Sequence, residues 1–306
     1  MKSKFIPPKD LSIGIVGNVA KSSTCETACA LIKILQERKI KFAVQTEIAG
    51  QMKATCRFDA GSSSLQSSEI PGCTDIIVSL GGDGTILRTA KLVGETGKPI
   101  LGINLGKLGF LAELNFDELR NSIDELFKGK FNIEDRTALI ATFEKGGKLS
   151  TIPALNDIVI DRAGSMRMID LETYVDSEYL ITYRADGIVI STPTGSTGYS
   201  LSTGGPIISP ESRVITISPI SPHTLTARPV IVPDDSEIRV VARSDSKQVM
   251  VNADGQTSHL LDQPAELKIS LASHRIKLLR KSKNGFFNLL RTKLMWGADI
   301  RTEEKA

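Results

Sequence analysis

The feature that most constrains this chain is an apolar run that ends in a glycine-rich turn and continues with helical spacing. The run is Asp75-Ile-Ile-Val-Ser-Leu80, and the turn is Gly81-Gly-Asp-Gly-Thr85. Apolar residues then recur three or four positions apart, at Ile86, Leu87, Ala90 and Val93. A short run without polar alternation is typical of a parallel strand buried on both faces. The sequence therefore predicts an α/β fold in which helices cover a parallel sheet.

The first third of the chain repeats this alternation of strands and helices. Further strands are predicted at residues 12–16, 42–45 and 99–103. One helix is predicted to follow a capping box at Ser23 and Glu26, and another to begin at Asn115 and end at Gly129. Residues 50–74 are polar, rich in glycine and serine, and without periodicity, so we expect a mobile loop there.

From about residue 130 the pattern changes to short apolar segments separated by Gly, Pro, Asp and Ser, as in an all-β domain. Strands are predicted at residues 155–160, 168–175, 180–183, 187–191, 214–218, 238–242, 248–252, 267–271 and 275–279. A last helical stretch covers 286–295. We therefore expect an α/β domain at 1–115, a β-rich domain at 116–285, and a C-terminal helix within 286–306 that can pack back on the first domain.

Composition limits the class of protein. A chain of 306 residues is about twice the ~150 residues typical of one domain, which favours two domains. The sequence is 41% hydrophobic and 24% charged, which excludes a disordered or fibrous protein. No run approaches the ~20 apolar residues of a membrane span, and a net charge of +3 is too small to indicate a nucleic-acid partner. The N-terminus lacks the apolar segment of a signal peptide, so we expect a cytoplasmic protein with neither nucleic acid nor membrane as partner.

The cysteines and histidines do not form a recognisable metal motif. The four cysteines are Cys25, Cys29, Cys56 and Cys73, too few for a disulfide scaffold in a chain of this length. Cys25 and Cys29 could share a helical face, but no histidine or further cysteine lies near them in the sequence. We interpret them as small buried hydrophobic residues. The three histidines lack the spacing of zinc ligands, so no metal-ligating residue is predicted.

The glycine-rich turn would lie at the carboxyl end of a buried strand, where open α/β sheets bind ligands. Gly81 and Gly82 allow a tight turn and a close approach of ligand to backbone. The N–H groups of Gly84 and Thr85 would lie at a helix N-terminus, which favours phosphate oxygens. Asp83 would present a carboxylate ready to accept a proton, although the turn could also be an ordinary strand–helix connection with Asp83 as N-cap. The P-loop and Gly-x-Gly-x-x-Gly patterns are absent, which disfavours Walker-type ATPases and standard dinucleotide dehydrogenases.

A second polar cluster is Thr192-Pro-Thr-Gly-Ser-Thr-Gly-Tyr-Ser200, followed by Leu-Ser-Thr-Gly-Gly-Pro206. Its hydroxyl groups offer donors and acceptors to a polar ligand, and the Tyr199 ring could stack on a base or a pyridine. The alternative is a surface loop rich in serine and threonine.

Two shorter signals precede this cluster. Arg184 and Asp186 alternate along a predicted strand and could face one cleft, although an exposed salt-bridged strand is the favoured interpretation. Asn156 and Asp157 lie inside an otherwise apolar strand, where they either end a bulge or bind a ligand with hydroxyl groups. The sequence leaves these two interpretations open.

Taken together, these residues resemble the NAD kinase family over most of the chain. The segments that carry the resemblance are Gly81–Thr85, Gly102–Leu111, Ala154–Asp157, Asp186–Thr197, Ser221–Pro229, Asp254–Gln256 and Leu290–Gly297. The glycine-rich turn alone is shared with phosphofructokinases and with diacylglycerol and sphingosine kinases. The segment Thr192–Thr197 and the Asn-Asp pair, in this order, distinguish NAD kinases from them.

The resemblance implies an α/β N-terminal domain, a β-rich C-terminal domain and a site in the cleft between them. Asp83 matches the family's proton acceptor, and His223 falls in its histidine-containing loop. The positions that match NAD-binding residues are Asp83, Gly84, Arg88, Asn156, Asp157, Arg167, Arg184, Asp186, Thr197, Gly198, Tyr199, Ser200, Leu201, Ser202 and Gln256. The phosphate donor would be bound by Gly81, Gly82, Gly84 and Thr85.

The implied reaction is transfer of a phosphoryl group from ATP, or from polyphosphate, to the 2′-hydroxyl of the adenosine ribose of NAD, which gives NADP. A divalent cation, Mg²⁺, would bridge the donor phosphates. The sequence shows no cage of carboxylates for this ion, as expected of a metal held largely by the nucleotide. The family is usually dimeric or tetrameric, so a homodimer or homotetramer is expected.

The chain departs from the family pattern at two positions. Gly198 stands where the family usually has alanine, and Ala185 stands where it usually has glycine. Neither change touches a reacting group.

Three other functions are alternatives to this interpretation: a lipid kinase of the diacylglycerol type, a phosphofructokinase, and a sensor that binds NAD or NADP without turnover.

Overall fold

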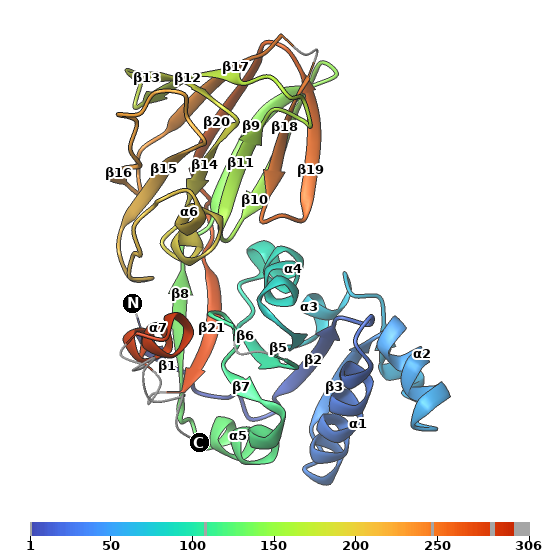
Figure 1. The fold of residues 1–306 in the computed structure, drawn as a ribbon. Coiled ribbons are helices and arrows are strands. Elements are labelled where there is room, and N and C mark those ends of the chain that lie inside the picture. The colour runs from blue at the N-terminus through green and yellow to red at the C-terminus, as the bar shows by residue number, and fades with distance from the viewer. Residues whose placement is uncertain (1, 107–108, 246–247, 282–284, 297–306) are drawn as a thin grey trace, which may run out of the picture. The chain divides into compact units, whose positions relative to one another are not determined.

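A computed structural model describes residues 2–106, 109–245, 248–281 and 285–296 (Figure 1). Two compact units make up the chain. The first comprises Met1–Leu92, Lys98–Glu134 and Lys277–Ala306, and the second comprises Val93–Gly97 and Asp135–Ile276. Two positions of the segment Gly102–Leu111, the last residue of Leu290–Gly297 and the end of the expected C-terminal segment lie outside the described residues. None of the helices in the described ranges has the length and apolar character that a membrane crossing requires.

The first unit is built on a twisted sheet whose strands follow the order β1-β8-β21-β6-β5-β2-β3-β4, with β7 paired to β6. The bounds of these strands, in that order, are β1 Lys2–Lys4, β8 Phe131–Arg136, β21 Ile276–Lys281, β6 Ile100–Asn104, β5 Ile76–Gly81, β2 Ser12–Gly17, β3 Lys41–Gln45, β4 Ser64–Leu65 and β7 Leu114–Asn115. β5 is buried along its whole length and pairs in parallel with β2 and β6, as the apolar run predicts. The sheet is mixed rather than purely parallel, because β1 pairs antiparallel with β8.

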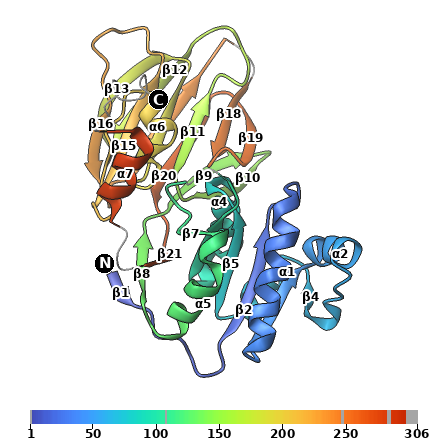
Figure 2. The same cartoon turned by 60° about the horizontal axis from the view of Figure 1, so that its bottom comes forward.

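Helices flank this sheet. Those of the first unit are α1 Ser22–Glu37, α2 Thr46–Thr55, α3 Ile70–Cys73, α4 Asp83–Val93, α5 Leu119–Phe127 and α7 Phe286–Leu294, with the short 3₁₀ turns η1 Gly61–Ser63 and η3 Phe116–Glu118. The 3₁₀ turn η2 Gly94–Thr96 falls in the second unit. Two views show α1 and α2 side by side at the β3 end of the sheet (Figures 1 and 2). At Asn115, where the sequence predicts a helix to begin, a capping box starts η3, which leads into α5. The helix predicted at 286–295 is α7.

Two local predictions are wrong. The helix α1 begins at Ser22, and its N-cap residue Lys21 makes no side-chain cap, so the capping box predicted at Ser23 is absent. The segment 50–74 is not a featureless loop, because it holds the end of α2, then η1, β4 and α3. Its apolar residues Met52 and Ile70 are fully buried, and this burial orders a segment whose composition is mostly polar.

The boundaries of the units differ from those expected at 115/116 and 285/286. They fall at 134/135 and 276/277, because α5, β8 and β21 contribute to the hydrophobic core of the first unit. Their side chains in that core are Leu119, Ile123, Leu126, Phe131 and Leu279. α7 is grouped with the first unit, and its packing on that unit stays a prediction.

The second unit is a pair of antiparallel six-stranded sheets that share one apolar core in its described part. The first sheet consists of β10 Lys148–Ala154, β9 Leu139–Lys145, β20 Ala265–Leu271, β17 Ile238–Arg243, β12 Ile169–Val175 and β13 Glu178–Ala185. The second consists of β16 Val230–Pro233, β15 Val214–Ile220, β14 Gly187–Ser191, β11 Asp157–Asp161, β18 Gln248–Ala253 and β19 Thr257–Asp262. The 3₁₀ turn η4 Gly195–Thr197 and the short helix α6 Tyr199–Ser202 follow β14.

The β-rich character of the second half is therefore confirmed. The sequence missed β9, β10, β16 and β19, whose exposed positions dilute the apolar pattern. The sequence places the last strand, β21, with the β-rich domain, whereas in the structure this strand pairs with β6 of the first sheet.

Candidate active site

The glycine-rich turn of the first unit joins the end of β5 to the start of α4. Gly81 is required here, because a Cβ on it would lie 2.1 Å from Oγ1 of Thr85. Gly82 and Gly84 have open space where a Cβ would stand, which lets a ligand approach the backbone. The N–H of Thr85 donates to the carbonyl oxygen of Gly82 at 2.9 Å. This N–H is thus used inside the turn, which weakens its predicted role in binding phosphate.

The carboxylate of Asp83 is held by the backbone of the segment that follows β6. Its Oδ2 accepts a hydrogen bond from the N–H of Phe110 at 2.7 Å, and its Oδ1 accepts from Leu111 at 3.0 Å and Ala112 at 3.4 Å. A Cβ on Gly109 would lie 1.8 Å from Oδ1, so only glycine fits beside the carboxylate. A carboxylate has about four acceptor positions, so these three donors fix its orientation and leave room for one more partner.

Arg88 lies one turn further along α4 and is exposed. It lines a hollow of about 270 Å³ together with Asn18, Gln45 and Thr85. A cation in a hollow beside the glycine-rich turn suits an anionic group of a ligand.

In the second unit, the start of β11 is held by a carboxylate from the turn between β18 and β19. Asp254 accepts hydrogen bonds from the N–H groups of Leu155 at 2.9 Å, Asn156 at 2.7 Å and Asp157 at 3.2 Å. Its own N–H donates to the carbonyl oxygen of Asp157 at 3.0 Å. The Asn-Asp pair is therefore positioned by backbone contacts, and its side chains remain available to a ligand.

Those side chains face a hollow of about 380 Å³, which is also lined by Asp161, Tyr199 and Asn252. Within the described part of the chain, the buried Oδ1 of Asn156 has no hydrogen-bond partner. Burial, and secondarily the charge of Asp254, raise the pKa of Asp157 to about 7. An unpaired amide oxygen and a carboxyl group poised near neutrality in one hollow are suited to ligand hydroxyl or amino groups.

The threonine- and glycine-rich segment packs against this pair. Thr192 donates from its N–H to the carbonyl oxygen of Asn156 at 2.9 Å and from its hydroxyl to Leu155 at 2.7 Å. A Cβ on Gly195 would lie 2.1 Å from the carbonyl oxygen of Asn156. Glycine at this position therefore lets the two backbones meet.

Most hydroxyl groups of this segment serve its own fold. Ser196 donates to the carbonyl oxygen of Pro193 at 2.7 Å, Thr197 to that of Thr194 at 3.4 Å, and Ser200 lies 3.4 Å from the hydroxyl of Ser218. A hydroxyl oxygen that donates keeps acceptor positions for a ligand, so the contacts expected of this segment stay a prediction.

Tyr199 is the exception, because its side chain is 45% exposed and lines the hollow. Burial raises its pKa, and the nearby carboxylates of Asp161, Asp186 and Asp157 raise it further.

Other predicted site residues do not line either hollow. Arg167 is exposed and pairs with Asp245 at 3.1 Å, and Arg184 is exposed on β13. Asp186 pairs with Arg162 at 3.0 Å rather than with Arg184. Leu201 and Ser202 come shortly after Tyr199 in the chain, and Gln256 comes directly after Gly255, both of which line the hollow beside Asn156. The N–H of His223 donates to the carbonyl oxygen of Arg184 at 2.8 Å.

Sequence reasoning did not include Asp254 or Gly109 among the site residues. The sequence does carry a signal for Asp254, because an Asp-Gly pair between two strands marks a tight turn. Both residues of that pair adopt left-handed backbone angles, with φ of +54° and +66°.

Two family models match this chain. The ATP-NAD kinase N-terminal domain matches residues 13–131, and the ATP-NAD kinase C-terminal domain matches residues 155–281. The chain belongs to the NAD kinase family. This membership rejects the lipid-kinase and phosphofructokinase alternatives, and it identifies the protein as an enzyme of the kinase and transferase class.

Relatives and solved structures agree with this assignment. The chain is 40% identical to the NAD kinase of Moorella thermoacetica over 95% of this chain and 92% of that protein. It is 41% identical to the NAD kinase of a Geobacter species (strain M21), over 93% and 98%. A yeast NADH kinase complexed with NADH superposes with a TM-score of 0.87 at 28% identity, over 98% and 95% of the two chains. An NAD kinase from Archaeoglobus fulgidus in complex with ATP gives 0.73 at 25% identity, over 93% and 99%.

The donor set for a divalent cation can be judged from the described residues. Among them, no three carboxylate or histidine groups converge as a metal site would require. The acceptor positions of Asp83 are largely taken by backbone N–H groups. These residues therefore do not fit a magnesium cage built by the protein.

Proposed function

We propose that this chain transfers the γ-phosphoryl group of ATP to the 2′-hydroxyl of the adenosine ribose of NAD, and so produces NADP. The observation that carries the proposal is the Asp83 carboxylate, held by three backbone N–H groups at the carboxyl end of β5. This is where open α/β sheets place reacting groups. Membership of the NAD kinase family indicates the reaction, and the geometry supports the roles that we propose for individual residues.

Asp83 accepts the proton of the 2′-hydroxyl as the oxygen attacks the γ-phosphorus. The bond between that phosphorus and the bridging oxygen of ADP breaks, and ADP leaves. Because the segment 109–112 fixes both carboxylate oxygens, Asp83 needs no reorganisation to meet the hydroxyl. A positioned general base contributes about 10²–10⁴-fold to a rate.

Asn156 and Asp157 bind the NAD ribose and adenine. The unpaired Oδ1 of Asn156 accepts a hydrogen bond from a ligand donor. Asp157, when ionised, accepts a hydrogen bond from a ribose hydroxyl, and the half-exposed ring of Tyr199 stacks on a ligand ring.

The remaining predicted contacts belong to the same proposal. They are Gly84, Arg88, Arg167, Arg184, Asp186, Thr197, Gly198, Ser200, Leu201, Ser202 and Gln256 for NAD, and Gly81, Gly82, Gly84 and Thr85 for the phosphate donor. Arg88 has the strongest support among the cations, because it lines a hollow together with Thr85 of the glycine-rich turn. A divalent cation, Mg²⁺, would be held by the donor phosphates. We also propose a cytoplasmic location and a homodimeric or homotetrameric assembly.

An NADP-forming assay tests this function. Purified protein is incubated with NAD, Mg²⁺ and either ATP or polyphosphate, and an NADP-specific dehydrogenase reports the product. We expect NADP with ATP, and parallel reactions with polyphosphate and with NADH define the donor and acceptor range. A folded protein that binds NAD but forms no NADP with either donor would favour the sensor alternative.

A further inference from the structure

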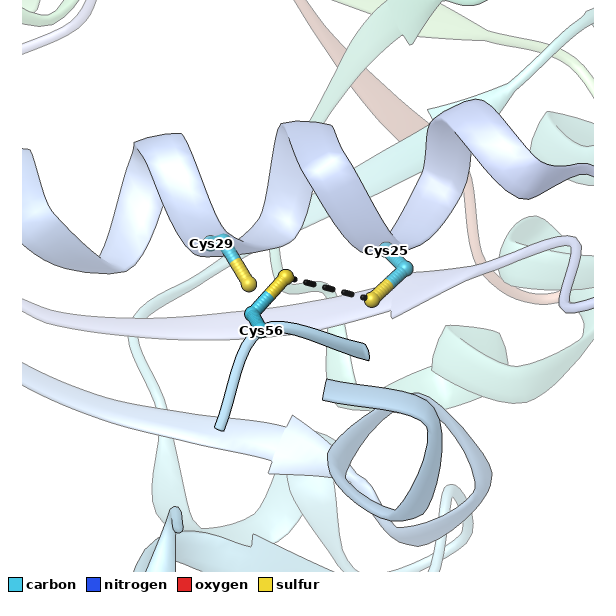
Figure 3. A group of neighbouring side chains, drawn as sticks. All are labelled: Cys25, Cys29 and Cys56. Carbon is cyan, nitrogen blue, oxygen red and sulfur yellow. Dashed lines mark hydrogen bonds between the residues drawn. The ribbon is translucent and has the colours of Figure 1, made fainter. Parts of the chain in front are cut away.

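Three cysteines of the first unit meet in space, although Cys56 lies 31 positions from Cys25 in the sequence. Cys25 and Cys29 lie on consecutive turns of α1 and are buried, and Cys56 follows the last residue of α2 and is exposed. The sulfur atoms all lie within 4.8 Å of one another, with 3.7 Å between those of Cys25 and Cys56 (Figure 3). The interpretation of Cys25 and Cys29 as simple hydrophobic residues missed this cluster, because α2 returns Cys56 to the face of α1.

The spacing of the sulfur atoms suits a shared metal ion. With a metal–sulfur bond of about 2.3 Å, sulfur ligands around one ion lie roughly 3.7–4.0 Å apart. The observed 3.7 Å between Cys25 and Cys56 agrees with that separation. A disulfide would require about 2.05 Å and would use only two of the three thiols.

We propose that Cys25, Cys29 and Cys56 form a three-thiolate site for a soft metal ion, Cu(I). Thiolate ligands select soft ions such as Cu(I) and Zn²⁺. Structural Zn²⁺ sites take four protein ligands, whereas in the described part of the chain no histidine or carboxylate joins the three thiols. Cu(I) accepts a shell of three sulfur atoms, which is what this cluster provides.

Binding at this site is coupled to proton release. A cysteine thiol is protonated near neutral pH, whereas the thiolate is the form that binds a metal ion. Three S–H bonds break, three Cu–S bonds form and three protons leave to solvent, while copper stays in its Cu(I) state. The apparent affinity consequently rises with pH.

The site would fasten two helices to each other. α1 and the end of α2 are neighbours, and the exposed Cys56 gives an ion access to the two buried thiols. Because the unfolded chain does not hold the three sulfur atoms together, the bound ion stabilises the folded state and raises its melting temperature.

Anaerobic titration of the reduced protein with Cu(I) against bicinchoninate tests the proposal. We expect one tightly bound ion per chain, proton release on binding and three sulfur neighbours in the copper X-ray absorption spectrum. Cys56→Ser changes an exposed position and should weaken the affinity for Cu(I) by at least ~10-fold. This is the smallest loss typical of mutating a group that only hydrogen-bonds to a metal ligand. Cys73→Ser is the matched control, because Cys73 is also exposed and its thiol donates to the carbonyl oxygen of Ile70 instead.

Equal Cu(I) affinity in the wild type and Cys56→Ser would overturn the proposal, as would a copper shell without three sulfur atoms. Kinase activity is not the readout, so failure of this site would leave the proposed function untouched.

Discussion

The carboxylate of Asp254 accepts a hydrogen bond from the backbone N–H of Asn156 at 2.7 Å, across 98 positions of the sequence. The same carboxylate accepts from Leu155 and Asp157. One side chain in a β-turn therefore fixes the backbone from which two of the proposed NAD contacts project. This dependence can be measured.

Replacing Asp254 with alanine leaves these three N–H groups without their acceptor. An unsatisfied buried donor costs about 1–3 kcal/mol, so we expect Asp254→Ala to lower the free energy of unfolding by at least that amount. It should also raise the KM for NAD more than it lowers kcat, because Asn156 and Asp157 lose their position. Urea unfolding and steady-state kinetics measure the two effects.

Asp262→Ala is the matched control for that variant. Asp262 lies on β19 of the same hairpin, is exposed, and accepts a hydrogen bond from the side chain of Gln248 at 3.0 Å. Its loss should cost less than about 1 kcal/mol. Equal KM values in the two variants would contradict a positioning role for Asp254.

The Asp157 carboxyl group predicts a pH dependence of stability. Its pKa is raised from 3.8 to about 7 by burial and by Asp254, so the folded state binds a proton that the unfolded state releases. The resulting stabilisation is complete below about pH 4 and is lost as the pH rises through 7. One pKa unit corresponds to about 1.4 kcal/mol.

Asp157→Asn removes this titration. Relative to the wild type, the variant should therefore gain stability as the pH rises from about 4 to above 7. Urea unfolding across this range measures the difference. If the free energies of unfolding of wild type and variant changed with pH in parallel, the Asp157 carboxyl would not titrate as described.

Two glycines in the segment after β14, Gly195 and Gly198, should respond differently to the addition of a methyl group. A Cβ on Gly195 would lie 2.1 Å from the carbonyl oxygen of Asn156, and backbone cannot yield easily. A Cβ on Gly198 would have its closest contact at 3.2 Å, to the carbonyl oxygen of Gly195. We expect Gly195→Ala to destabilise by about 1–3 kcal/mol and to raise the KM for NAD. Gly198→Ala requires its neighbour to move by only a few tenths of an ångström, so it should cost less stability and change the KM less than Gly195→Ala. Similar losses in both variants would contradict this geometry.

Sequence patterns predicted those parts of the fold and site that depend on residues close together in the chain. The apolar run before Gly81 identified β5, and the glycine-rich turn placed Asp83 at its end. Contacts between distant segments left no local signal. The Asp254 contact to Asn156 and the approach of Cys56 to Cys25 both arise only when the chain folds back on itself. The same holds for the hydroxyl-rich segment, because its sequence does not reveal that the Thr192 and Ser196 hydroxyls donate to backbone carbonyl oxygens.

The central claim is that Asp83 accepts the proton of the 2′-hydroxyl, and Asp83→Asn tests it most directly. An asparagine would turn its NH₂ group toward one of the N–H donors at 110–112, so unfolding must be measured beside activity. Asp117→Asn, at an exposed position of η3, serves as the control.

The decisive measurement is kcat for NADP formation by Asp83→Asn, combined with the NAD dissociation constant from calorimetry. We predict that kcat falls by about 10²–10⁴-fold, while the dissociation constant stays within a few-fold of wild type. Wild-type turnover by a folded Asp83→Asn variant would contradict the role of Asp83 as the proton acceptor.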